Sequence, residues 1–177
     1  MVRDGSSYGN DGTATGVSTV PDLDGMAAQF SGAAMISIPP AASLNPPTEF
    51  TLDAWVRPVT LPAAGARYGV FDRNGQFGMF LMDTGELRCS ATNVVTGGSI
   101  PVNVWTHVAC VISPTAVELY VNGLLAVTAA RSGALNTGNQ DVVAVGANSP
   151  SGDSFQGRLD RVRLWQTAHP ANRVCTQ

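Results

Sequence analysis

The stretch WTHVACVISPTAVELYVNGLLAV, which runs from Trp105 to Val127, decides the fold. Apolar and polar residues alternate from Val117 to Val121, and this two-residue period is that of a strand with one buried face. Asn122-Gly123 comes next, and both residue types tolerate the positive φ angles of a tight hairpin turn. Trp105–Ile112 is largely apolar on both of its alternating faces, which predicts a strand covered on both sides. The stretch is therefore predicted to form an antiparallel meander.

Similar strand-like segments follow one another at short intervals along the whole chain. They are Ala27–Phe30, Met35–Ile38, Phe50–Arg57, Tyr68–Asp72, Phe77–Leu81, Leu87–Ala91, Trp105–Ile112, Ala116–Val121, Leu124–Ala129, Val142–Gly146 and Leu159–Trp165. Turn signals such as Asn74-Gly75 and Thr84-Gly85 separate them. No segment has the apolar spacing of an amphipathic helix over a helical length. We therefore predict an all-β protein, a sandwich of two antiparallel sheets.

The composition agrees with this fold class and excludes some functions. A chain of 177 residues is long enough for one domain with a sizeable core. It contains 19 Gly and 11 Pro, and only 13% of its residues are charged, which favours short strands and tight turns. The net charge is −3 and no run of basic residues occurs, so nucleic-acid binding is not expected. No apolar run of about 18 residues is present, so membrane insertion is not expected either.

Several motifs occur in the order that a known family has them. They are GNDG (Gly9–Gly12), FTLDAWVRP (Phe50–Pro58), WTHVAC (Trp105–Cys110), VELYVNGLLA (Val117–Ala126) and FQGRLDRVRLWQTA (Phe155–Ala168). Together they resemble the laminin-G-like, concanavalin A-like jelly-roll domains of the pentraxin-related branch. The resemblance implies one jelly-roll sandwich over residues 1–177, with an extracellular adhesive or carbohydrate-binding role and often calcium. The chain starts almost at the GNDG loop, so we expect it to be a segment of a longer extracellular protein with neighbouring domains.

The cysteines give an indication of the cellular compartment in which the protein folds. Cys89 and Cys110 lie on predicted strands that the meander could bring together, and family members with similar LRC and WTHVAC segments look disulfide-linked. We predict a Cys89–Cys110 disulfide, with free thiols as the alternative. Cys175 is left without a predicted partner. A disulfide would place the protein outside the cell or in the periplasm.

The carboxylates do not form the pattern of a glucan-cutting enzyme. Such enzymes on this fold place Glu-x-Asp-x-Glu on one strand, so that nucleophile and acid share a face. Glu49 and Asp53 lack the carboxylate that would stand between them. His107 has no partner at zinc-ligand spacing, and we expect a structural imidazole hydrogen-bonded within the sheet. The chain is therefore predicted not to be an enzyme.

A first candidate calcium site involves Asp160. This residue falls on the same predicted face as Val162 and Leu164 in the strand Leu159–Trp165, so its carboxylate should point inward. An inward carboxylate is costly unless a cation or N–H donors satisfy it. We expect Asp160, Asp4 and Asn10 to supply oxygen ligands to calcium. The alternative is that Asp160 accepts backbone N–H bonds or pairs with an arginine.

A second candidate calcium site rests on the resemblance to pentraxins. The segments FDRNG (Phe71–Gly75) and GANSPSGDS (Gly146–Ser154) resemble the two loops that carry calcium in that branch. The oxygen donors that match are Asp72, Asn74, Asn148 and Asp153. The alternative is that these are ordinary turn-forming residues.

Candidate sugar-binding residues are those that could form an aromatic platform beside polar groups. Trp55 shares a predicted strand face with Asp53 and Arg57, while Tyr68 and Arg73 flank a loop. The alternative for Trp55 is burial under loops, because tryptophan is usually well buried. The sequence thus predicts a binding module for a glycan or a cell-surface protein, with calcium stabilising a rim loop. A polysaccharide-degrading enzyme and a structural spacer domain are the alternatives.

Overall fold

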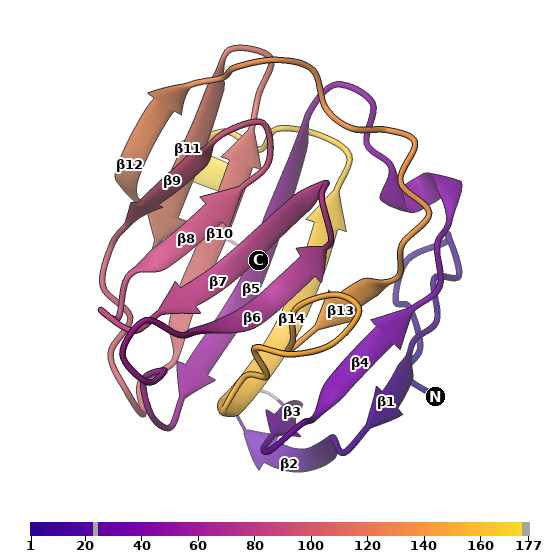
Figure 1. Ribbon diagram of the computed structural model, residues 1–177, viewed down its shortest axis with the longest axis vertical. Helices are drawn as coiled ribbons and strands as arrows, with labels where there is room; N and C mark the ends of the chain where they lie inside the picture. The colour runs from indigo at the N-terminus through magenta and orange to yellow at the C-terminus, as the bar shows by residue number, and fades with distance from the viewer. Residues whose placement is uncertain (23–24, 175–177) are drawn as a thin grey trace.

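The computed structural model describes residues 1–22 and 25–174, which form two facing antiparallel sheets (Figure 1). The front sheet of Figure 1 has the spatial order β1 (Thr13–Thr15), β4 (Met35–Ile38), β13 (Val143–Val145), β6 (Arg67–Arg73), β7 (Phe77–Met82), β8 (Leu87–Ser90) and β9 (Val94–Gly97). The back sheet has the order β12 (Leu124–Ala130), β11 (Ala116–Val121), β10 (Thr106–Ile112), β5 (Phe50–Pro58), β14 (Gly157–Trp165), β3 (Gly25–Phe30) and β2 (Ser18–Asp22). Short 3-10 helices occupy Ala42–Leu44 and Ala171–Arg173. No helix in this part of the chain is long and apolar enough to cross a membrane.

The predicted jelly-roll sandwich is confirmed, and each predicted strand is present with ends shifted by at most two residues. The prediction missed β1, β2 and β9. All three lie at the edges of their sheets, where strands are short and largely exposed. An edge strand has little buried surface, so its sequence shows no clear apolar alternation, and Pro21 further weakens the signal in β2.

The core lies between the sheets, and strand alternation fills it. In β5, Leu52, Ala54 and Val56 point inward and are at most 1% exposed. β10 is buried along its whole length, as predicted. Its outer face is covered by the C-terminal segment, because Val174 packs with Ala109, Val111 and Tyr120. The meander turn is also confirmed, since Asn122 and Gly123 have φ angles of 49° and 76°.

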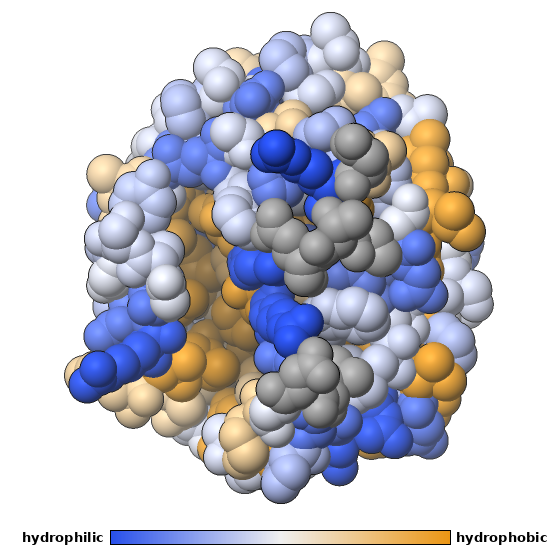
Figure 2. All heavy atoms as spheres, turned by 180° about the vertical axis from the view of Figure 1, so that it is seen from behind, coloured by the Kyte–Doolittle hydropathy of each residue, from blue (hydrophilic) through white to orange (hydrophobic). Residues whose placement is uncertain are grey.

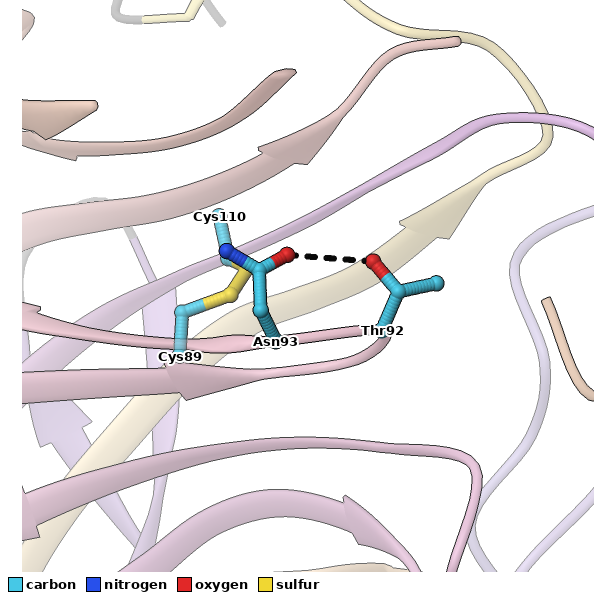
Figure 3. The surroundings of a disulfide bond; sticks show 4 residues. All are labelled: Cys89, Thr92, Asn93 and Cys110. Carbon is cyan, nitrogen blue, oxygen red and sulfur yellow. Dashed lines mark hydrogen bonds between the residues drawn. A yellow bond between two sulfur atoms is a disulfide. The ribbon is translucent and has the colours of Figure 1, made fainter. Parts of the chain in front are cut away.

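The predicted Cys89–Cys110 disulfide is present and joins the sheets through the core (Figure 3). Cys89 belongs to β8 of the front sheet and Cys110 to β10 of the back sheet, with Cα atoms 6.0 Å apart. Both residues are fully buried. Cys175 lies outside the described residues. The bridge fixes β8, and with it the turn that follows, against the centre of the back sheet.

Asp53 is the centre of a buried polar cluster on the outer face of the back sheet. Its side chain is almost inaccessible, yet both carboxylate oxygens are paired. Arg163 donates from Nε and Nη2 to Oδ1 at 2.8 and 2.6 Å, and Trp165 donates from Nε1 to Oδ2 at 2.6 Å. Charge-assisted bonds of this kind offset the cost of removing a carboxylate from water.

The structure corrects the prediction that Asp160 points inward. The register between β5 and β14 shifts between Asp160 and Arg163, and Arg161 has a φ of 47°. This β-bulge reverses the alternation, so Leu159 enters the core and Asp160 faces outward opposite Trp55. The Asp160 carboxylate accepts the N–H of Arg161 at 2.8 Å. The hydrogen-bonding alternative that the sequence left open therefore describes Asp160.

The expectation for His107 is only half right. The imidazole is 1% exposed, as expected for a structural residue in the sheet. However, neither ring nitrogen has a hydrogen-bond partner among the described residues. Nε2 lies 3.6 Å from Asp53 Oδ1, and the ring meets Trp55 edge-on with 5.4 Å between the ring centroids. The Asp53 carboxylate already accepts hydrogen bonds from Arg163 and Trp165, so it does not serve as an acceptor for His107.

The disulfide should contribute substantially to stability. Its two cysteines are 21 positions apart in the sequence. Closing a loop of this size lowers the conformational entropy of the unfolded chain, which raises the free energy of unfolding by about 3 kcal/mol. Replacing both cysteines with serine, or reducing the wild-type protein, should lower the free energy of unfolding by that order. Urea denaturation with and without reductant measures this. Identical midpoints for oxidised and reduced protein would contradict the prediction.

The carboxylate of Asp53 should be as important as the disulfide. Removing it in Asp53→Ala leaves the partly buried Arg163 and Trp165 without their acceptor, which costs about 2–3 kcal/mol. Asp160→Ala is the control, because that carboxylate is partly exposed and bonds within its own bulge. We expect a large loss of stability in urea denaturation for the first variant and about 1 kcal/mol or less for the second. Equal losses of stability in the two variants would show that the Asp53 carboxylate contributes no more to stability than the Asp160 carboxylate does.

Candidate functional site

A polar groove lies at the end of the sandwich where three connections meet. These are the β6–β7 turn, the β8–β9 turn and the long connection from β12 to β13, which crosses this end of the molecule in orange (Figure 1). The groove consists of depressions of about 170 and 360 Å³ that share Gly75, Gln76 and Ala91. The remaining lining residues are Asp72, Phe77 and Ser90 in the smaller depression, and Thr92, Ser132, Gly133, Ala134, Leu135 and Asn136 in the larger. We call this feature the rim groove.

Arg73 fastens the crossing connection to the sandwich. Its guanidinium is fully buried and donates to the carbonyl oxygens of Leu44, Asn139 and Asp141 at 2.8–3.1 Å. It also donates to Asn45 Oδ1 at 3.0 Å. Burial lowers the pKa of Arg73, and the nearby Asp141 carboxylate opposes this shift. Arg73 was predicted to bind ligand, but its donors are engaged in holding backbone carbonyls beside the groove.

Gln76 carries the most unusual polar atom of the groove. Its side chain is 6% exposed, and Nε2 donates to Asn45 Oδ1 at 3.0 Å and to Asn136 O at 2.5 Å. Because Nε2 has two acceptors, the orientation of the amide is fixed. Oε1 is buried and has no hydrogen-bond partner in the described part of the chain. A buried acceptor without a donor is costly.

Asp72 lies at the inner end of the groove. It is 5% exposed, and its Oδ2 accepts the N–H of Ser149 at 2.8 Å. Oδ1 lies over Gly78, the residue opposite Asp72 on β7. A Cβ atom at Gly78 would come within 2.6 Å of Oδ1 and 2.4 Å of the Phe80 ring, so these side chains pack directly against the glycine and leave no room for a larger residue. Burial raises the pKa of Asp72 to about 6, while the Ser149 N–H and Arg67 act in the opposite direction.

Hydrogen bonds between the connections hold the walls of the groove in place. Ser132 donates to Thr92 O at 3.3 Å, and Asn136 donates to Gly75 O at 3.4 Å. The β8–β9 turn begins two residues after Cys89, so the disulfide supports one wall (Figure 3). Such a site is largely formed before any ligand arrives, which lowers the entropic cost of binding.

The first set of predicted calcium ligands is not arranged around one point. Asp4 and Asn10 do lie together in the N-terminal loop, where Asn10 N–H donates to Asp4 Oδ2 at 2.8 Å. The Asp4 carboxylate also accepts from the backbone N–H and the hydroxyl of Ser6, and these bonds help to lower its pKa. Asp160 is bonded within the β14 bulge instead.

The second set of predicted calcium ligands is partly brought together. The loop that carries Asn148 and Asp153 folds back over β6, since Gly69 N–H donates to Asp153 O and Ser149 N–H donates to Asp72. Asp153, however, forms an ion pair with Arg67, with 2.7 Å between Arg67 Nε and Asp153 Oδ2. The arginine therefore already neutralises the carboxylate that calcium would need. Asn74 lies apart in the β6–β7 turn, where its carbonyl accepts from Asn139. Among residues 1–22 and 25–174, no group of three or more His, Cys, Asp or Glu side chains could hold a metal ion.

The predicted aromatic residues lie outside the groove. Trp55 is partly buried on the outer face of the back sheet, and its buried Nε1 has no hydrogen-bond partner among the described residues. Figure 2 views the molecule from this side and shows a hydrophilic column beside a hollow with a hydrophobic floor. Tyr68 is partly buried, donates to Leu61 O at 3.3 Å and packs edge-on against Phe155. Neither ring forms part of the rim groove.

Sequence reasoning missed most of the groove, including Gln76, Ser90, Thr92 and the wall around Asn136. One signal could have found it. The connection between β12 and β13 is long and rich in Ser, Gly, Asn and Thr, and long loops without secondary structure are often functional. The position of Gln76 gives no comparable signal, because its lack of a partner depends on the folded surroundings.

Comparison with solved structures also supports the jelly-roll architecture. The structure of domain 4 of AbnA, a GH43 extracellular arabinanase from Geobacillus stearothermophilus, in complex with arabinotriose, matches with a TM-score of 0.74 and 23% identity. The match covers 93% of this chain and 86% of that chain. At this identity, the likeness establishes the fold alone.

Bacterial toxin binding domains have the same fold. The binding domain of Paraclostridial Mosquitocidal Protein 1 matches with a TM-score of 0.79 and 18% identity, over 98% of this chain and 48% of that one. The binding domain of botulinum neurotoxin DC in complex with rat synaptotagmin II matches with a TM-score of 0.73 and 12% identity, over 98% and 47%. This chain therefore spans about half the length of each toxin domain.

Comparison with curated proteins gave no match. At the level of sequence families, the model described as the concanavalin A-like lectin/glucanases superfamily matches residues 30–175. That span includes β4 to β14 and therefore most of both sheets and the whole rim groove. The chain belongs to the concanavalin A-like lectin/glucanases superfamily, as its jelly-roll motifs predicted.

Proposed function

We propose that this chain is a non-catalytic carbohydrate-binding module whose ligand enters the rim groove. The observation that carries the proposal is the unpaired, buried Oε1 of Gln76 in the wall of a polar, preformed groove. Sugar hydroxyls are donors that could satisfy such an acceptor. The lining hydroxyls and amides of Ser90, Thr92 and Asn136 add further partners of both kinds.

The comparisons support a sugar ligand without locating it. The arabinanase domain was solved with arabinotriose bound, and the match with this chain covers most of both chains. A surface protein is the second candidate, because the neurotoxin binding domain was solved with rat synaptotagmin II. The groove favours the sugar, since its dimensions and polar lining suit a few monosaccharide units better than a protein interface.

The arrangement of carboxylates supports a binding role over hydrolysis. Glycoside hydrolysis uses a pair of carboxyl groups that flank the scissile bond. Asp72 is the one carboxylate among the described residues that line the groove. Asp53 is engaged by Arg163 and Trp165 on the opposite sheet. We infer equilibrium recognition, in an extracellular or periplasmic setting that suits the disulfide.

Glycan binding can be tested on an array of neutral and charged oligosaccharides, followed by calorimetry with the best ligand. The wild-type protein should bind at least one glycan, and Gln76→Leu should weaken binding about tenfold or more, because it removes the Oε1 acceptor together with the two hydrogen bonds that Nε2 donates to the groove wall. Gln140→Leu is the matched control, because Gln140 is exposed and outside the groove lining. A protein that binds no glycan on the array would be a spacer or a protein-binding domain.

Calcium stabilisation remains a prediction from the family resemblance, and the candidate ligands do not fit it well. Arg67 neutralises Asp153, and donors of its own loop occupy Asp4. We therefore expect the melting temperature to be the same in millimolar calcium and in excess chelator. A rise of several degrees in calcium would show that a bound ion stabilises the fold, and Asp153→Asn and Asp4→Asn would then identify the loop.

A further inference from the structure

The arginines of this chain differ in how their charge is compensated. The chain contains no lysine, so arginine supplies its permanent side-chain cations. Several arginines lie within 4.0 Å of a carboxylate: Arg57 and Arg158 of Asp22, Arg67 of Asp153, Arg161 of Asp160, and Arg163 of Asp53. Apart from the exposed Arg3 and Arg173, the described arginines that form no such ion pair are Arg73, Arg88 and Arg131.

The arginines that lack an ion pair lie around the rim groove. Arg73 is buried behind it. Arg88 stands two residues before Ser90, which lines the smaller depression, and Arg131 directly precedes Ser132, which lines the larger one. Positive charge without a paired carboxylate is therefore concentrated beside the groove.

Arg88 is the arginine of this group whose donors are free. It lies on the outer face of β8, opposite Phe80 on β7 and the exposed Thr96 on β9. Its Nε is buried without a partner among the described residues, and its Nη1 and Nη2 donate no hydrogen bond to them but are not buried. The outer edge of the guanidinium therefore reaches solvent, with two groups that can pair with the oxygens of an incoming anion.

The carboxylates nearest to Arg88 have other partners. On β6, at the far side of Phe80, Arg67 stacks 4.0 Å from the ring centroid and pairs with Asp153. Glu86 stands two residues before Arg88 on the same face of β8, but its Oε2 accepts from Thr84 Oγ1 at 2.9 Å and it forms no ion pair with Arg88. Arg88 thus lacks the acid that Arg67 has on the same face.

Arg131 adds a second positive charge, at the other end of the groove. It donates from Nε to Gly133 O at 3.2 Å and from Nη1 to the carbonyl oxygens of Ser113 and Thr48 at 3.0 and 2.5 Å. These carbonyl groups fix the orientation of the guanidinium, but they carry no net charge. The positive charge of Arg131 therefore still acts on a ligand in the groove.

Asp72 is the carboxylate that opposes this positive charge from within the described lining. It belongs to β6, two strands away from β8, which corresponds to about 10 Å. Burial raises its pKa to about 6, so the proton that removes its charge is bound in mildly acidic solution. An anion bound to Arg88 would lie much closer to the arginine than to Asp72, so attraction outweighs repulsion.

We propose that the rim groove selects acidic glycans, with Arg88 binding a carboxylate or sulfate on the sugar next to the one in the smaller depression. This inference rests on the proposed carbohydrate-binding function and assigns Arg88 as a residue that determines specificity. Ser90 and Arg88 share the outer face of β8 and are about 7 Å apart along it. A glycan chain that occupies the groove at Ser90 and continues along β8 therefore passes over Arg88.

Calorimetry with a chemically matched pair of ligands tests the proposal. Trigalacturonate carries a carboxylate on every sugar, and its carboxyl-reduced form has the same linkage without the charge. We expect trigalacturonate to bind about tenfold more tightly in low salt. This advantage should shrink at about 0.3 M salt, because ions screen accessible charges. A sulfated trisaccharide compares sulfate with carboxylate, and oligoglutamate tests whether any acidic chain binds as well.

The variant Arg88→Gln should remove most of the tenfold advantage and leave the affinity for the reduced trisaccharide unchanged. Its urea midpoint should equal that of the wild type, because Arg88 forms no hydrogen bond or ion pair within the described fold. Arg3→Gln is the matched control, because it removes the same charge from an exposed position outside the groove lining. It should leave both affinities unchanged.

The possible results separate this inference from the function on which it rests. A reduced trisaccharide that binds as tightly as trigalacturonate would overturn the selectivity and leave the binding function intact, and so would equal losses in Arg88→Gln and Arg3→Gln. Oligoglutamate that binds as tightly as trigalacturonate would overturn the assignment to glycans. Absence of binding to every glycan would overturn both proposals.

The site itself can be located in the wild-type protein, so the test does not depend on the folding of Arg88→Gln. Amide shifts on titration with trigalacturonate should appear at Arg88, Ser90 and Thr96. Shifts confined to residues away from β8 and the groove would refute the assignment of Arg88.

Discussion

The packing of β10 in the middle of the back sheet is the constraint on which the structure depends. One face of this strand enters the core and carries Cys110, which is bonded to Cys89 of the front sheet. The other face is covered by the C-terminal segment through Val174. A strand that is dry on both faces cannot shift its register without burying polar groups or opening cavities. Both sheets are therefore held in one relative position.

The rim groove takes its shape from this rigid arrangement. The disulfide holds β8 and the turn after it, and the hairpin of β6 and β7 supplies the opposite wall with Asp72 and Gln76. The connection from β12 to β13 passes from the back sheet to the front sheet and closes the groove (Figure 1). Arg73 ties this connection down through carbonyl oxygens rather than through a carboxylate. Its charge is thereby used for architecture.

Several charged residues of this chain satisfy one another in structural pairs. Asp53 is enclosed by Arg163 and Trp165, and Asp153 is bound to Arg67. Residues that looked like metal ligands in the sequence are thus largely committed to bonds within the fold. Among the described residues that line the groove, the buried polar atom without a hydrogen-bond partner is the acceptor Gln76 Oε1.

The sequence by itself determined the fold class, most strands, the Asn122-Gly123 turn and the pairing of Cys89 with Cys110. These features depend on local periodicity, on turn residues that accept positive φ, and on family motifs. Only the tertiary structure decided that Asp160 faces outward, because a β-bulge reverses alternation without changing residue type. It alone revealed the rim groove, because whether Gln76 finds a partner depends on loops distant in sequence. Periodicity reports which face is buried, whereas the availability of a polar atom is set by every neighbour around it.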